Sequence, residues 1–181
     1  LEGGVGGDAF AWELEGDERH VQTLHRLAKL AEGGLQVEWK VPRVRFTAEA
    51  DLDKLRLVIQ RQQDWFGLQG ELKVDERRVA LAALLEAARA RRRWVKLGEA
   101  DYVLLSERLV EKLAPLAHLA EQGQLPQLTL GTVPLLEALS SQVEALEAAE
   151  EWKRLTQRLL SARDVRPRVP KQLKATLRDY Q

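Results

Sequence analysis

The chain has 181 residues, of which 45% are hydrophobic and 31% are charged, and its formal net charge is zero. This composition is ordinary for a folded globular protein, and it excludes a chain that is disordered throughout. The absence of cysteine excludes a disulfide framework and cysteine metal sites, and it fits a reducing cytoplasm.

The sequence predicts neither a secretory signal nor a membrane anchor. Residues 1–11 lack the charged region followed by an apolar region that a signal peptide requires. No apolar run approaches the roughly 18 residues that span a bilayer. We therefore expect a cytoplasmic protein with no membrane partner. The chain opens on a glycine-rich stretch without an initiator methionine and closes on an amphipathic stretch, so we expect both ends to continue in a longer protein.

Residues 1–54 are predicted to form an N-terminal strand–helix–strand unit. The sequence LQVEWK at 35–40 has the composition of a short strand. The helix before this strand is marked by apolar residues at three-and-four spacing, namely Val21, Leu24, Leu27 and Leu30.

This unit has a counterpart later in the chain. ELEGDERHV at 13–21 is similar to ELKVDERRV at 71–79, and each segment is followed by a predicted helix and a strand containing tryptophan. An internal duplication would produce this likeness. Short strand–turn–helix segments also look alike by chance, which is the commoner origin.

Residues 55–131 are predicted to form an α+β region. LRLVI at 55–59 and WFGLQGELKV at 65–74 are rich in β-branched, aromatic and alternating residues, which favour strands. The stretches at 93–97 and 102–105 flank a GEAD turn and predict a hairpin. Ser106 is placed to cap a helix that ends near Gly123. The apolar positions of the two helices in this region are Leu81, Leu84, Leu85, Ala88, Leu109, Leu113 and Leu116.

Residues 132–162 are predicted to be helical. Thr132 can cap a helix that has Pro134 in its first turn. The apolar stripe Leu136, Leu139, Val143 and Leu146 continues into Trp152, Leu155 and Leu159 only if the helix kinks or breaks within 147–151.

Residues 163–181 are predicted to be a linker followed by the start of another element, because Pro167 and Pro170 prevent an uninterrupted helix. The expected fold class is therefore α+β. It comprises small antiparallel sheets with packed helices, then a C-terminal helical hairpin and the linker.

The candidates for catalysis are few. His20 and His25 lie five residues apart, which places them about 140° apart around a helix, so they cannot chelate one metal ion together. His118 has no histidine near it in the sequence. The sequence contains no GxSxG elbow and no phosphate-binding GxxxxGK[ST] loop. We therefore expect no catalytic residues, no metal and no cofactor within this chain.

Two basic stretches are candidates for nucleic-acid contact. In the first, four arginines and one lysine surround Trp94, a mixture that can hold phosphates and stack a base; they are Arg89, Arg91, Arg92, Arg93 and Lys96. The simpler interpretation is a helix C-terminus, which favours cations, followed by a strand that buries Trp94. The second stretch is spread along the linker and includes Arg166, Arg168 and Lys171, and it is equally compatible with a solvated linker.

The pattern PxxLxxxLRxYQ at 170–181 resembles the entry to the motor of SWI/SNF-family ATPases. The resemblance implies that Gln181 corresponds to the glutamine that reads the adenine of ATP, with Tyr180 and Arg178 beside it. Upstream, DWFGLQGELKV at 64–74, the following helix and the hairpin at 94–105 are similar to the accessory region that bacterial members carry before the motor. The resemblance covers about residues 55–181.

The resemblance implies a DNA-dependent ATPase as the parent protein, with ATP and Mg²⁺ as its cofactors. The phosphate loop, the acidic magnesium box and the arginine fingers of the family are not in this chain, so we expect no ATPase activity from it alone. Two hypotheses follow. The chain is an accessory module that packs on the RecA-like lobes of the motor, or it binds double-stranded DNA or another partner and delivers the motor to its substrate. An unrelated helical scaffold with a chance match is a third interpretation.

Overall fold

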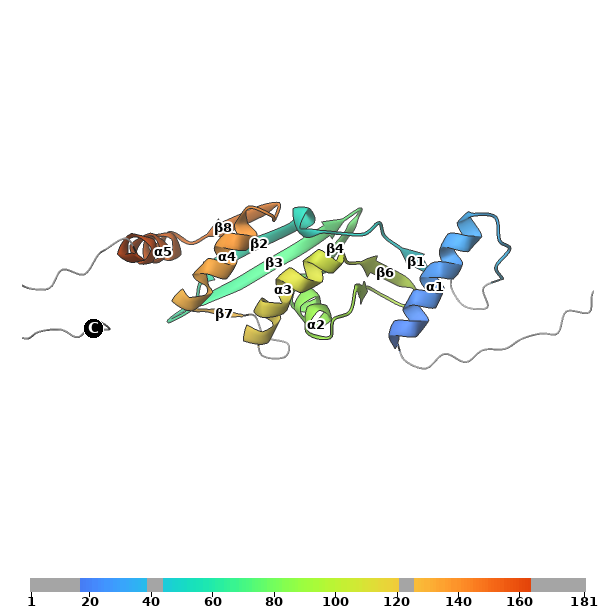
Figure 1. Cartoon of the computed structure of the whole chain (residues 1–181), viewed down its shortest axis with the longest axis horizontal. Coiled ribbons are helices and arrows are strands. Elements are labelled where there is room, and N and C mark those ends of the chain that lie inside the picture. The colour runs from blue at the N-terminus through green and yellow to red at the C-terminus, as the bar shows by residue number, and fades with distance from the viewer. Residues whose placement is uncertain (1–16, 39–43, 121–125, 164–181) are drawn as a thin grey trace, which may run out of the picture.

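A computed structural model describes residues 17–38, 44–120 and 126–163. Within these ranges, eight strands form two sheets, and helices pack against both sheets (Figure 1). The helices are α1 (Asp17–Glu32), α2 (Leu81–Arg89), α3 (Glu107–Leu119), α4 (Val133–Ser140) and α5 (Glu150–Arg163), with short 3-10 turns η1 (Leu52–Lys54) and η2 (Leu130–Thr132). The strands are β1 (Arg45–Phe46), β2 (Leu55–Arg61), β3 (Phe66–Val74), β4 (Arg77–Ala80), β5 (Trp94–Lys96), β6 (Asp101–Leu104), β7 (Gln127–Leu128) and β8 (Ala145–Ala148).

The larger sheet has the strand order β4-β3-β2-β8, and β7 pairs with one end of β3. β2 shows the alternation that a sheet with one buried face requires. Its residues Leu55, Leu57 and Ile59 are fully buried, whereas Arg56 and Gln60 are exposed. The hydrophobic pattern of β2 therefore fixes which face of this sheet meets the core.

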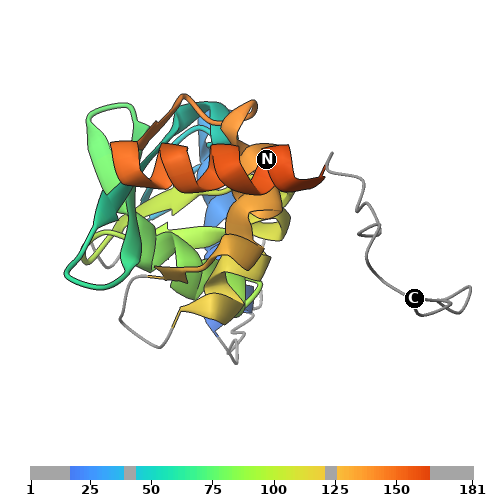
Figure 2. The same cartoon turned by 90° about the vertical axis from the view of Figure 1, so that its left-hand side faces the viewer.

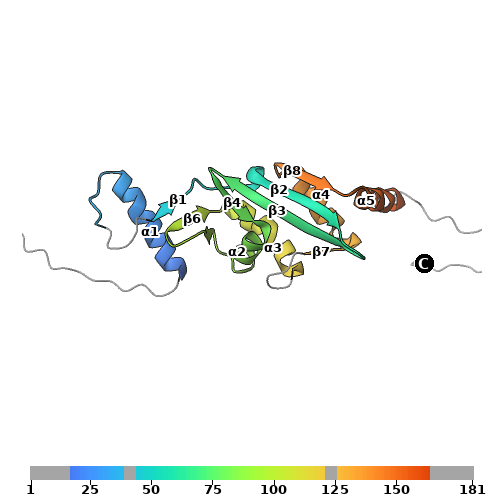
Figure 3. The same cartoon turned by 180° about the vertical axis from the view of Figure 1, so that it is seen from behind.

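Helices cover one face of the larger sheet. Figure 1 shows α3 and α4 in front of β2 and β3, and Figure 3, from behind, shows these strands in front of the helices. The apolar positions predicted for α2 and α3 are all buried in one continuous core that also contains the inward residues of β2 and β3. The Ser106 hydroxyl accepts a hydrogen bond of 3.0 Å from the Leu109 amide, which caps α3 as predicted.

The smaller sheet has the order β1-β6-β5 and packs against α1 through a second cluster of aromatic and aliphatic side chains. The rings of Trp94 and Tyr102 meet edge to face with centroids 5.8 Å apart, and Phe46 stacks on Tyr102 at 5.4 Å. Val21 of α1 is buried in this cluster. This second cluster explains why α1 forms beside a sheet of only three short strands.

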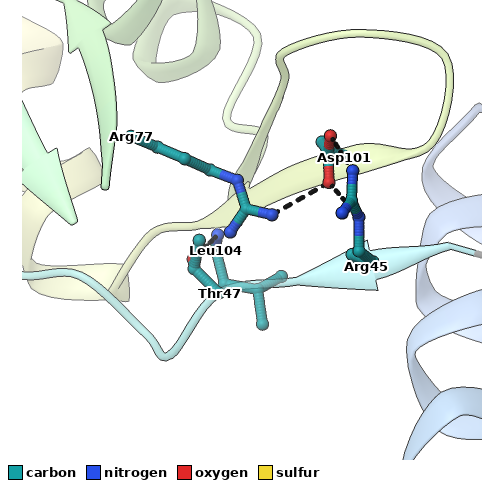
Figure 4. Close-up of polar contacts among 5 residues, drawn as sticks. All are labelled: Arg45, Thr47, Arg77, Asp101 and Leu104. Atoms are coloured by element: carbon teal, nitrogen blue, oxygen red, sulfur yellow. Dashed lines mark hydrogen bonds and ion pairs between the residues drawn. The ribbon is translucent and has the colours of Figure 1, made fainter. Parts of the chain in front are cut away.

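Asp101 joins the two sheets. It lies at the start of β6 and accepts hydrogen bonds of 2.9 Å from Arg45 of β1 and from Arg77 of β4 in the larger sheet (Figure 4). The hydrogen bond from Arg45, supported by Arg77, holds the pKa of the Asp101 carboxyl below its ordinary value, although partial burial raises it. Beside this group, the Leu104 amide donates to the Thr47 hydroxyl at 3.2 Å.

The structure confirms the α+β class and most of the elements predicted for residues 55–131. Strands β2 and β3, helix α2, the antiparallel hairpin β5–β6 and helix α3 all lie where the sequence places them. Gly123 lies outside the described residues.

The C-terminal stretch is broken into two helices, as the slip in its apolar stripe predicted, but the break contains a strand that the sequence did not predict. Val143 lies beyond the end of α4, and Leu146 lies in β8, which pairs in parallel with β2. The predicted helical stretch is therefore two helices separated by a strand. The hydroxyl of Thr132 does not cap α4, because it donates to the Thr129 carbonyl at 2.7 Å.

Two further expectations were wrong. The predicted strand at 35–40 is not present over residues 35–38, and residues 39–40 lie outside the described part of the chain. The sheets are mixed and not purely antiparallel, since β1–β6 and β2–β8 are parallel pairs.

The two similar segments also fold differently where both are described. Residues 17–21 belong to α1, whereas 75–79 form a turn followed by β4. The described structure therefore gives no support to an internal duplication.

A methyl group added at Gly70 is expected to destabilise the larger sheet. An alanine Cβ there would lie 2.4 Å from the Arg56 carbonyl oxygen and 2.8 Å from Leu57 Cδ2, which is too close for either atom. Overpacking of this kind costs about 1–3 kcal/mol, so Gly70→Ala should lower the urea midpoint. Gly98→Ala is the matched control, because a Cβ there meets nothing within 4 Å. Equal midpoints for the two variants would contradict the tight pairing of β2 and β3.

The contribution of Asp101 to the free energy of unfolding should depend on pH. Because the folded state holds the Asp101 pKa below its ordinary value, its stabilisation is present above pH about 4 and is lost as the pH falls further. The free energy of unfolding of Asp101→Asn, measured in urea, should therefore fall below that of the native chain at pH 7 and approach it at pH 3. Glu99→Gln, a nearby exposed carboxylate with no partner among the described residues, should show no such convergence.

Candidate functional site

The first basic stretch lies where α2 ends and the chain turns back into β5. Arg89, the last residue of α2, binds Glu86 at 2.8 Å, the Ala117 carbonyl at 2.6 Å and the Ala120 carbonyl. The two carbonyls belong to the C-terminal end of α3, which a cation stabilises. Arg89 therefore ties α2 to α3, and both of its terminal nitrogens already have acceptors within the fold.

The neighbouring cations also contact the protein itself, although the buried Nε of Arg92 has no hydrogen-bond partner among the described residues. Arg92 lies over the Trp94 ring at 5.0 Å from its centroid, and Lys96 lies 5.9 Å from the centroid of Tyr102. Arg93 donates to Glu49 at 2.6 Å and to the Leu105 carbonyl at 3.3 Å. Trp94 is only 7% exposed, so the fold covers the ring that a nucleic-acid base would stack on.

Arg91 differs from the other arginines of this stretch. It is exposed, it occupies the left-handed backbone region with φ of 53°, and it lines a groove of about 430 Å³ together with Glu107 and Glu111. Arg93 also lines this groove, so two arginines face two carboxylates and the groove offers a phosphate no surplus of positive charge.

The other predicted contacts lie outside the described residues. These are the linker cations Arg166, Arg168 and Lys171 and the ATP-associated residues Arg178, Tyr180 and Gln181. Their predicted roles stay predictions.

A surface that the sequence reasoning missed lies where the turn between β2 and β3 meets α5. Figure 2 shows α5 lying across this end of the molecule. The turn and the helix enclose an open groove of about 420 Å³, which we call the Trp65 groove. Its lining residues are Arg61, Gln63, Asp64, Trp65, Phe66, Glu151, Arg154, Leu155 and Arg158.

The two sides of the Trp65 groove are fixed to each other by an aromatic contact. Phe66 at the start of β3 meets Trp152 of α5 edge to face with centroids 5.2 Å apart, and Trp152 is 5% exposed. Arg61 and Glu151 add an ion pair of 3.5 Å across the same junction. The groove is therefore built from two elements that lie almost 90 residues apart in the chain.

Trp65 lies at the rim of the groove, and its indole packs against the backbone of Gly67, where the lack of a side chain leaves room for it. A Cβ on Gly67 would lie 3.0 Å from the indole Cζ3 and 3.4 Å from Cη2. The turn is closed by a hydrogen bond of 2.7 Å from the Gln62 amide to the Trp65 carbonyl. The indole is 36% exposed, a large exposure for an aromatic ring that the backbone positions so closely.

Another groove, of about 530 Å³, lies between α1 and β1 and contains His25, Lys29 and Arg45. Partial burial, with Lys29 nearby, lowers the pKa of His25, whose ring lies 4.9 Å from that of Phe46. Arg45 already binds Asp101. These contacts place His25 in a packing role.

The described residues contain no group of three or more potential metal ligands of the His, Cys, Asp and Glu types. None of the helices within the described ranges combines the length and the apolar character needed to cross a bilayer. Comparisons of the chain with protein-family models, with curated proteins and with solved structures found no match.

Replacing Arg89 should reduce stability, because its substitution leaves carbonyls at the end of α3 without a charged donor. We expect Arg89→Ala to lower the free energy of unfolding in urea by about 1–3 kcal/mol. Arg91→Ala is the matched control, since Arg91 is exposed and has no partner among the described residues, and it should change this free energy by less than about 0.5 kcal/mol. Weaker DNA binding by Arg89→Ala at unchanged stability would identify Arg89 as a phosphate contact and contradict the structural role.

Proposed function

We propose that this chain is an accessory module of a bacterial SWI/SNF-type ATP-dependent DNA translocase, and that it packs on the motor and tunes it. In this proposal the motor follows residue 181 and binds ATP and Mg²⁺. The partners of the module are the RecA-like lobes of that motor. The segments described here contribute no catalytic residue.

The resemblance at 64–74 and 94–105 motivates the proposal, and the way in which these segments fold supports it. They form β3 and the β5–β6 hairpin, and α2 lies between them in the chain and packs with them. Inward side chains of all these elements, such as Leu72, Leu84 and Val103, belong to one core. A segment that folds around its own core is suited to act as a module beside a motor.

The observation that carries the packing proposal is the internal use of the arginine stretch. Arg89 and Arg93 bind acceptors within the fold, and Arg92 and Lys96 lie on buried rings. A module that delivers a motor to DNA requires cations that are free to meet phosphates. Within the described residues, four of the five cations of this stretch thus contact the fold itself and Arg91 alone of the five does not, and this distribution favours packing on the motor over delivery to DNA.

The proposal predicts the effect of removing the module from the longer protein. We expect a shortened version that begins at Arg163 to hydrolyse ATP without DNA at a rate that differs several-fold from that of the full protein, because contacts that bias lobe closure are lost. The DNA concentration giving half-maximal stimulation should change less than twofold. Steady-state ATP hydrolysis over a titration of double-stranded DNA measures both quantities.

The other outcomes of this experiment are also decisive. An unchanged rate without DNA, combined with a much higher DNA requirement, would identify a delivery module. Absence of ATP hydrolysis in both proteins would overturn the relationship to SWI/SNF motors.

A further inference from the structure

The Trp65 groove presents the most exposed of the described tryptophans. Among the described tryptophans, Trp94 and Trp152 are 7% and 5% exposed, whereas Trp65 is 36% exposed. Tryptophan and arginine are the residue types most enriched among the few that dominate protein–protein binding energy. Trp65 has arginines on the facing helix, so the composition of the groove is that of a protein interface.

The helix side of the groove carries two exposed cations. Arg154 and Arg158 lie one turn apart on α5, and neither forms an ion pair with a described residue, although Glu150, one turn before Arg154, attracts it electrostatically. Like charges at this spacing repel each other and destabilise a helix by about 0.2–0.5 kcal/mol. A partner that brings carboxylates to both arginines would remove this repulsion.

One apolar residue of α5 adds to the groove. Leu155 lines the groove, whereas Leu159, one turn further on, is half-buried against the core. The exposed Leu160 lies about 140° around the helix from Leu155 and does not extend the groove. Trp65 and Leu155 together supply a small apolar centre, and the arginines supply a charged rim.

We propose that the Trp65 groove is the surface through which this chain binds the motor lobe that follows residue 181. The indole of Trp65 enters an apolar pocket of the lobe, and Arg154 and Arg158 pair with carboxylates at the rim of that pocket. This inference rests on the proposed function, and it specifies which surface of the module contacts the motor.

The position of the groove in the chain is suited to this partner. α5 forms one wall of the groove, its last residue is Arg163, and 18 residues follow it up to and including Gln181. A chain of 18 residues spans at most about 65 Å. A lobe that begins at Gln181 is therefore tethered to the wall of the groove, and tethering raises its effective concentration there.

The charges of the groove favour a protein over a nucleic acid. Asp64 and Glu151 line the same groove, and against its three arginines they leave a net charge of only +1. A polyanion would meet these carboxylates as well as the arginines. A protein surface can place its own charges selectively around the indole.

The test uses the full-length protein with the substitutions Trp65→Ala and, separately, Arg154→Glu with Arg158→Glu. Both variants should change the rate of ATP hydrolysis without DNA toward that of the version beginning at Arg163. The controls are Leu97→Ala, which removes an apolar side chain of similar exposure (39%), and Lys112→Glu, which reverses an exposed charge on α3. Both controls should retain the rate of the full protein.

A second measurement reports the contact directly. Amide hydrogen exchange in residues 61–68 and 152–160 should be at least about tenfold slower in the full protein than in the 181-residue chain, and each groove variant should lose this protection. Far-UV circular dichroism checks that the variants fold. The arginine variant keeps the test valid if Trp65→Ala does not fold, because both arginines are exposed on α5.

The outcomes separate this inference from the proposed function. If removal of residues 1–162 changes hydrolysis but the groove variants and the exchange pattern do not, the module acts through another surface and the inference is overturned. If protection appears only when an oligonucleotide is added, the groove binds nucleic acid and the inference is likewise overturned. If removal of residues 1–162 does not change ATP hydrolysis, the proposed function is overturned, and the inference that rests on it is overturned with it.

Discussion

The antiparallel pairing of β2 with β3 is the constraint on which the rest of the fold depends. Seven residue pairs join these strands, from Leu55 opposite Leu72 to Arg61 opposite Phe66. β3 also pairs with β4 and β7, and the free edge of β2 accepts β8, so every strand of the larger sheet is placed by these two. The close approach at Gly70 leaves no room for a different side chain, which helps to fix the register and, with it, the face that meets the helices.

The smaller sheet is attached to this frame by short-range polar contacts. Ala50 and Leu105 form a parallel bridge, and the Ser106 hydroxyl donates to Asp51 at 2.7 Å while it caps α3. Asp101 joins the same two parts from the other side of the hairpin. Arg91, Arg93 and Lys96 of the arginine stretch stay exposed, but Arg89, Arg92, Arg93 and Lys96 contact groups of the fold itself, which reduces the number of cations that this surface presents unpaired.

The elements that could be predicted from the sequence are those whose hydrophobic, turn or capping pattern agrees with the secondary structure that they adopt in the fold. β2 alternates clearly, the β5–β6 hairpin has a turn sequence between two apolar runs, and Ser106 precedes a helical stripe. β8 was missed because ALEA has helical composition, and it becomes a strand only because β2 offers an open edge, so tertiary context overrides propensity. The Trp65 groove was missed because neither DWFG at 64–67 nor RLTQR at 154–158 has, on its own, a pattern that indicates a binding surface. Only the contact of Phe66 with Trp152 brings them together.

The attachment of α5 at two places has a mechanical consequence. Its 14 residues make a rod about 21 Å long. Its first turn is anchored to the larger sheet by Trp152 and by the β8 strand that precedes it, and Leu159 packs against the same core further along. A helix that is held at two points cannot swing about one of them without breaking the other contact. A change in packing around Phe66 is therefore transmitted as a movement of the whole helix, which carries Arg163, where the chain continues.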